Sequence, residues 1–117
     1  MYNYFFLVGR LTRDAEVVEY PEGKRVVKIS LAVNRSFKNS KGEVETDFFN
    51  ISIWDFLVDF VLDNLKTGMA VGVKGRIQNS SWDVPNFKSI TMTNLIGDKV
   101  VLFTSPGELN QIKNEEF

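Results

Sequence analysis

Between residues 25 and 35, apolar and polar side chains alternate almost residue by residue. One parity holds Val27, Ile29, Leu31 and Val33, and the other holds Lys28, Ser30 and Asn34. Because successive side chains of a strand point to opposite faces, this pattern predicts a strand that is buried on one face only. The segments before and after it contain further short strands and one helix.

These strands are expected at about 4–12, 45–54, 70–80 and 89–103, the last with a break near Gly97-Asp98. Gly9, inside the first strand, indicates a bend or a close backbone approach. Apolar residues at 57, 58, 61, 62 and 65 predict a helix over 55–66, with Asp55 as its N-cap and Gly68 closing it. The stretch 82–87 is expected to be a loop. This order is typical of an all-β, five-stranded OB-fold barrel with one helix between strands 3 and 4, although other β-rich topologies share it.

The composition excludes several function classes. The chain has no cysteine and no histidine, so it lacks thiolate metal ligands and the commonest catalytic base. We therefore expect no catalytic residue, no metal, no cofactor and no enzymatic activity. No apolar stretch approaches the roughly 20 residues of a membrane span, and no signal peptide opens the chain. A cytoplasmic protein that does not contact membranes is expected. The net charge of -1 does not by itself indicate a nucleic-acid binder.

The strand at 45–54 carries the functional signal. One face holds Phe49, Ile51 and Ile53, which is an ordinary core face. The other face holds Phe48, Asn50, Ser52 and Trp54. If that face is solvent-exposed, its two aromatic rings provide a stacking platform for nucleobases, since every base has a π-face. The alternative is a strand that is buried on both sides.

Basic and aromatic side chains near this strand extend the candidate surface. Lys74 and Arg76 share the polar face of the strand at 70–80, and Trp82 follows that strand. Phe37 lies beside Arg35 in the loop after the second strand, and Lys28 lies on that strand's polar face. Cations beside aromatic rings can pair with phosphates or stack on bases. Taken singly, each of these residues is also compatible with an ordinary solvated or packed position.

Four motifs resemble bacterial and phage-type single-stranded-DNA-binding proteins. They are LVGRLT at 7–12, YPEG at 20–23, LAVNRSF at 31–37 and VGVKGR at 71–76. Their order and spacing match over residues 1 to about 104. The resemblance implies a homotetramer, or a dimer as in some relatives, that wraps single-stranded DNA during replication, recombination and repair. It places the stacking aromatics on Phe37, Phe48, Trp54 and Trp82, and polar or basic DNA-path positions on Arg10, Arg35 and Arg76. We expect weak sequence preference, with at most a pyrimidine bias.

The chain departs from the family pattern at several points. Ala15 stands where proline is usual, and Phe49 stands where histidine is frequent near a subunit contact. The hairpin around 82–87 is short. We expect residues 1–105 to form the OB-fold domain and residues 106–117 a short acidic tail. The end of that tail, Glu115, Glu116 and Phe117, resembles a recruiting tip for replication or repair proteins, and it is equally compatible with a solvated tail.

The sequence is also compatible with two other functions. The first is an OB-fold adaptor that packs Trp54 and Trp82 against a protein partner. The second is a metal-dependent nuclease, which needs clustered carboxylates. The acidic residues of 43–47 lie in a loop and those of 55–63 along a helix face, where solvated charge is the ordinary explanation. The pattern therefore disfavours the nuclease.

Overall fold

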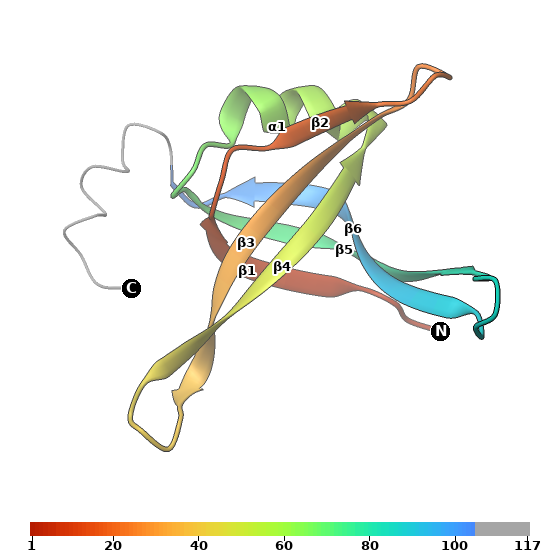
Figure 1. The fold of residues 1–117 in the computed structure, drawn as a ribbon. Helices are drawn as coiled ribbons and strands as arrows, with labels where there is room; N and C mark the ends of the chain where they lie inside the picture. Colours follow the sequence, from red (N-terminus) through yellow and green to blue (C-terminus); the bar gives the residue numbers. More distant parts are fainter. Residues whose placement is uncertain (105–117) are drawn as a thin grey trace.

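The computed structural model describes residues 1–104, which form a small barrel with two projecting arms (Figure 1). Its elements are β1 (Phe5–Leu11), β2 (Glu16–Glu19), β3 (Arg25–Lys38), β4 (Val44–Trp54), the 3-10 helix η1 (Asp55–Leu57), α1 (Val58–Asn64), β5 (Ala70–Trp82) and β6 (Ile90–Leu102). The arms are the outer halves of the β3–β4 and β5–β6 hairpins, which point away from each other. The helix lies at the end of the barrel opposite the β3–β4 arm.

Five of these strands close the barrel. They follow one another in the order β1-β5-β6-β4-β3, and β1 also pairs with β3. All neighbours are antiparallel except β4 and β6, which are parallel. The predicted all-β, five-stranded OB-fold barrel with one helical connection is therefore confirmed. No helix of residues 1–104 is long and apolar enough to cross a membrane.

The sequence pattern does not predict β2. This strand pairs with the first four residues of β3, from Glu16 opposite Lys28 to Glu19 opposite Arg25. All four of its residues are exposed, so no alternation of buried and solvated side chains reveals it. A tight turn joins the two strands: the Gly23 N–H donates to the Tyr20 carbonyl at 3.0 Å, and Gly23 has φ +83°. Pro21 and Gly23, two residue types that are common in turns, thus lie in the connection between β2 and β3.

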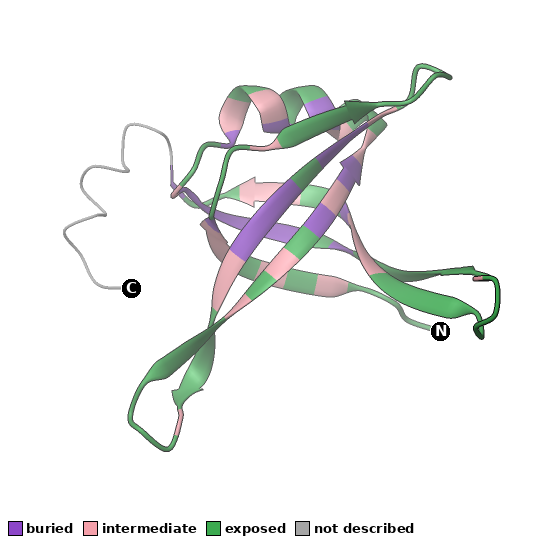
Figure 2. Cartoon of the chain, viewed as in Figure 1, coloured by how far each residue is buried: buried purple, intermediate pink, exposed green. Residues whose placement is uncertain are grey.

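Two strands extend further than their sequence pattern suggests. The strand predicted to end near Arg35 continues to Lys38, and the strand predicted to end near Ser80 continues to Trp82. Both extensions lie in the arms, where nearly every residue is exposed (Figure 2). A two-stranded ribbon in solvent has no buried face, so the hydrophobic period ends before the strand does.

A glycine and a β-bulge account for two irregularities that the sequence predicts in the barrel strands. A Cβ on Gly9 would lie 2.4 Å from the Ala32 carbonyl oxygen, which explains the close approach expected there. The break expected near Gly97-Asp98 is a β-bulge within a continuous β6. Its register passes from Lys74 opposite Lys99 to Gly75 opposite Gly97, which leaves Asp98 as the extra residue.

The core fills the barrel and the space under the helix. It consists of Leu11, Val27, Ile29, Leu31, Ile51, Ile53, Val58, Val61, Leu65, Met69, Val71 and Val73. The predicted helical stripe is confirmed, since Val58 and Val61 are fully buried and Leu57 and Leu62 pack against the core. The predicted N-cap is wrong: Asp55 belongs to η1 and has φ +56°, and neither helix start has a side-chain cap. The α-helix ends at Asn64, and Gly68 lies in the turn that follows, with φ +88°.

Candidate functional site

The two faces of β4 divide as its parity predicts. Ile51 and Ile53 are buried in the core. On the other face, Phe48 is 67% exposed, Asn50 is exposed, and Ser52 and Trp54 are half-buried. This face therefore lies on the outside of the barrel, where an aromatic ring stands at each end of a short polar stretch.

Trp54 is held by a second aromatic ring. The Tyr20 ring, in the β2–β3 turn, stacks on it with a centroid distance of 5.6 Å and an interplanar angle of 20°. The two rings line one hollow of about 610 Å³ together with Arg76, whose Nη1 lies 2.9 Å from the Asp98 carboxylate. Stacking restricts the indole to one orientation while leaving part of it accessible. The structure thus brings two of the predicted site residues, Trp54 and Arg76, to the same hollow.

The chain leaves β4 through a residue with positive φ. Asp55 has φ +56°, a left-handed conformation that L-residues other than asparagine and aspartate rarely adopt. This turn separates Trp54, which stays on the barrel wall, from Phe56, which is 85% exposed on η1. It also brings the Asp55 side chain to the rim of the Trp54 hollow.

Arg35 on β3 is held by two carboxylates from β4. Its Nε and Nη2 donate to Asp47 at 2.9 and 3.1 Å, and its Nη1 donates to Glu45 at 2.5 Å. These hydrogen bonds lower the pKa of Asp47 and raise the pKa of Arg35. The predicted phosphate-binding cation is therefore already neutralised by its neighbours on the same arm.

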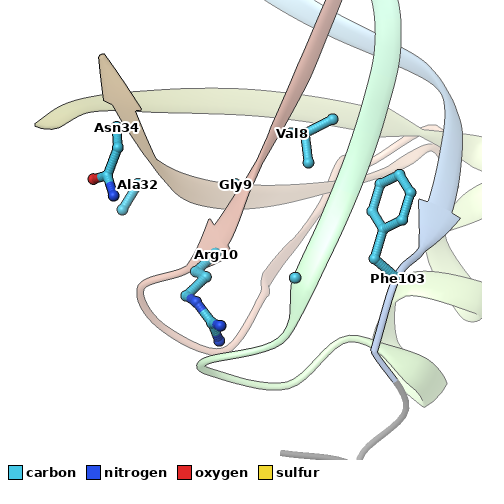
Figure 3. A pocket seen from close by; sticks show the side chains of 7 residues that line it. Val8, Gly9, Arg10, Ala32, Asn34 and Phe103 are labelled. Carbon is cyan, nitrogen blue, oxygen red and sulfur yellow. The ribbon is translucent and has the colours of Figure 1, made fainter. Parts of the chain in front are cut away.

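The other predicted cations have different surroundings. Lys74 lies over the Tyr4 ring, with its Nζ 5.4 Å from the centroid. Arg10 donates to the Gly68 carbonyl at 2.8 Å and lines a hollow of about 460 Å³ on the β1 side of the barrel (Figure 3). Lys28 is exposed on β3, opposite Ser52, and forms no ion pair with another residue of 1–104. These three cations are not gathered around the Trp54 hollow.

Two predicted aromatics lie on the arms. Phe37 is 67% exposed on the β3–β4 arm, and Trp82 is 46% exposed near the tip of the β5–β6 arm, opposite Ile90. Because the arms diverge (Figure 1), the structure spreads the four predicted aromatics along the barrel and its arms rather than gathering them in one pocket.

Tyr20, the partner of Trp54, is not among the site residues that the sequence predicts. Neither are Met92 and Asn94 of β6, which line a hollow beside Asn50 and Ser52. In the sequence, Tyr20 is noticeable only as part of a turn motif, and Met92 and Asn94 only as residues of an uncharged stretch of strand. Their contact with β4 depends on the β2–β3 turn and on the parallel pairing of β4 with β6, which no local pattern reveals.

The remaining predictions concern metals and the tail. Among residues 1–104, no group of three or more carboxylates is placed to hold a metal ion. The predicted tail, including Glu115, Glu116 and Phe117, lies outside the described residues.

Comparisons with known proteins converge on one family. The model of the single-strand binding protein family matches residues 2–103. A single-stranded DNA-binding protein of Halalkalibacterium halodurans is 40% identical over 111 residues, which are 95% of this chain and 66% of that protein. Single-stranded DNA-binding protein B of Bacillus subtilis is 38% identical over 100 residues, which are 86% of this chain and 88% of that protein. The chain thus spans about two thirds of the length of some of these relatives.

One solved structure resembles the fold. The structure entitled "Plasmodium falciparum SSB complex with ssDNA" superposes with a TM-score of 0.72 at 24% identity. The superposition covers 89% of this chain and 96% of that one. At this level of identity the likeness concerns the barrel alone.

Proposed function

The chain belongs to the single-strand binding protein family, and on that premise we propose that it binds single-stranded DNA with weak sequence preference and protects it during replication, recombination and repair. Proteins of this family are binding proteins rather than enzymes, in agreement with the expected absence of catalysis. The observation that carries the proposal is the outer face of β4, where Phe48 and Trp54 flank two polar side chains.

In the proposed mechanism, bases stack on the rings of Phe37, Phe48, Trp54 and Trp82. Stacking contributes about 1–3 kcal/mol per base and needs no particular base. Lys28 and Lys74 are exposed on the outside of the barrel and would contact the DNA, while Arg10, Arg35 and Arg76 would first have to leave their present partners. Because Arg35 and Arg76 already face carboxylates, stacking supplies more of the affinity than charge does.

We further propose that the chain forms homo-oligomers, a tetramer or else a dimer. The support is an apolar surface on β1 and the end of the barrel, where Phe6 is 52%, Val8 46% and Phe103 52% exposed. Val8 and Phe103 line the hollow of about 460 Å³ (Figure 3). Clustered exposed apolar side chains on a small domain usually mark a contact surface. Sedimentation equilibrium tests this: Phe6→Ser and Val8→Ser together should lower the oligomer mass, and an unchanged mass would contradict the proposal.

The test of the proposed function uses the two tryptophans as separate reporters. Trp54→Phe and Trp82→Phe variants each keep a single indole, and each is titrated with oligo(dT) at low and high salt. We expect both indoles to be quenched, with binding that persists over much of the salt range. Absence of quenching in both variants, or tighter binding to duplex DNA, would contradict the proposal and favour the protein adaptor instead.

A matched pair of phenylalanines checks the stacking surface. Phe48→Ala should weaken oligo(dT) binding by roughly 5-fold to 100-fold, because it removes one stacking platform. Phe60→Ala removes an exposed ring from α1, which lines none of the hollows beside Trp54, Asn50 and Ser52, and should change affinity less than about twofold. Equal losses in both variants would contradict a specific role for the β4 face.

A further inference from the structure

A hollow of about 350 Å³ lies on the outer surface between β4 and β6. Its walls include Lys28 of β3, Asn50 and Ser52 of β4, and Met92 and Asn94 of β6. The strand register explains this grouping, since Lys28 lies opposite Ser52 and the parallel pair places Ser52 beside Ile96, which has the same parity as Asn94. The hollow is thus built by the sheet itself rather than by a loop.

The polar side chains that β3 and β4 contribute to this hollow have no partner among residues 1–104. Lys28, Asn50 and Ser52 form no side-chain hydrogen bond or ion pair with other residues of 1–104. In contrast, the guanidinium groups of Arg35 and Arg76 are bound to carboxylates. Lys28 therefore provides an available cation in a concave part of the outer surface.

The hollow also lies between two aromatic rings. Asn50 and Ser52 separate Phe48 from Trp54 on the same face of β4, and six residues of strand span about 20 Å. If DNA stacks on both rings, as the proposed function requires, the nucleotides between them pass over the hollow. A base that turns its edge inward would meet side chains that donate and accept hydrogen bonds.

The chemistry of these side chains favours one kind of base edge. The Lys28 ammonium has three donors and no acceptor, and Asn50 offers two donors and one acceptor. Thymine, guanine and cytosine carry a carbonyl oxygen, whereas adenine carries none. We propose that this hollow binds the edge of a carbonyl-bearing base, with Lys28 donating to the carbonyl oxygen and Asn50 bonding the neighbouring edge atoms. The inference rests on the proposed DNA binding and gives it a modest preference against adenine.

The test separates a base contact from a phosphate contact. Lys28→Met and Asn50→Leu are measured by competition against labelled oligo(dT), with two unlabelled competitors of equal length. One is oligo(dT), and the other is an oligomer of 2,4-difluorotoluene deoxynucleotides, which keep the shape of thymine without its carbonyl groups. Lys66→Met is the matched control, because it removes the same charge at the end of the helix. Thermal melting followed by circular dichroism verifies that each variant folds.

We expect wild-type protein to prefer oligo(dT) over the mimic. Lys28→Met and Asn50→Leu should each weaken oligo(dT) binding roughly fivefold to tenfold and change mimic binding less than twofold. Lys66→Met should change neither. Equal losses for both competitors, with a salt slope shallower by about 0.7, would show that Lys28 contacts phosphate and would overturn the inference. Unchanged binding in both variants would overturn it as well. If wild-type protein binds neither oligomer, the proposed function itself fails.

Discussion

The Tyr20 ring stacks on the Trp54 ring, which joins the β2–β3 turn to the end of β4 across the outer surface of the barrel. Tyr20 is 44% exposed, so the pair lies at the surface rather than in the core. One face of the indole is thus occupied by a neighbour from another element. A partner ring of this kind reduces the rotamer freedom that Trp54 would lose on binding a base.

Removing the Tyr20 ring should therefore weaken DNA binding through Trp54. Aromatic pairs contribute about 0.5–1.5 kcal/mol beyond buried area, so Tyr20→Ala should reduce oligo(dT) affinity by roughly 2-fold to 10-fold. Tyr20→Phe keeps the ring and should retain the affinity. Fluorescence titration of the variant that keeps only Trp54 gives the measurement. If Phe weakens binding as much as Ala, the hydroxyl group rather than the stack is responsible.

Freeing Arg35 should strengthen DNA binding. Glu45→Gln combined with Asp47→Asn removes both carboxylates that neutralise the guanidinium. One additional available cation should increase affinity and steepen the salt slope on single strands by about 0.7. The same two substitutions in an Arg35→Met background should leave the slope unchanged. A slope that steepens equally in both backgrounds would show that the carboxylates act without Arg35.

Replacing Gly75 should disturb the barrel at its bulge. A Cβ there would lie 1.8 Å from the Ile96 carbonyl oxygen, a backbone atom that cannot move independently. Gly75→Ala should lower the free energy of unfolding by at least about 3 kcal/mol. Gly42→Ala is the comparison: nothing lies within 4 Å of that Cβ, and φ +78° alone should cost about 1–2 kcal/mol. Urea unfolding that ranks Gly42→Ala as the more damaging change would refute this account.

The Asp14–Thr67 contact should make stability depend on pH. Thr67 donates its N–H and hydroxyl to Asp14 Oδ1 at 3.0 and 2.7 Å, which lowers the Asp14 pKa below its ordinary value of 3.8. A carboxyl group with a lowered pKa stabilises the fold above about pH 3.8, and this contribution is lost as pH falls through the lowered value.

Asp14→Ala should consequently melt at a lower temperature than wild type at pH 7. The difference should shrink as the pH falls below 3.8. Thermal melting of both proteins over a pH series provides the measurement. A difference that persists unchanged in acid would show that the ionised carboxylate is not the stabilising group.

The sequence alone determined the barrel strands, the helix stripe and the outward face of β4. Each of these depends on a local period: Val27, Ile29 and Leu31 alternate with polar residues, and Val58, Val61 and Leu65 follow a helical repeat. Burial on one face imposes such a period on any strand or helix, so it can be read without knowing the neighbours. The absence of histidine and cysteine likewise excludes imidazole and thiolate chemistry, whatever the fold.

Tertiary structure decided which residues meet. No local period places Tyr20 against Trp54, ties Arg35 to Asp47 across the arm, or builds the hollow that joins Lys28 to Asn94. These contacts follow from strand register and from the parallel pairing of β4 with β6, elements separated by more than thirty residues. The exposed strand β2 and the outer ends of β3 and β5 escaped prediction for a related reason. A ribbon with no buried face is held by backbone pairing, which leaves no hydrophobic pattern in the sequence.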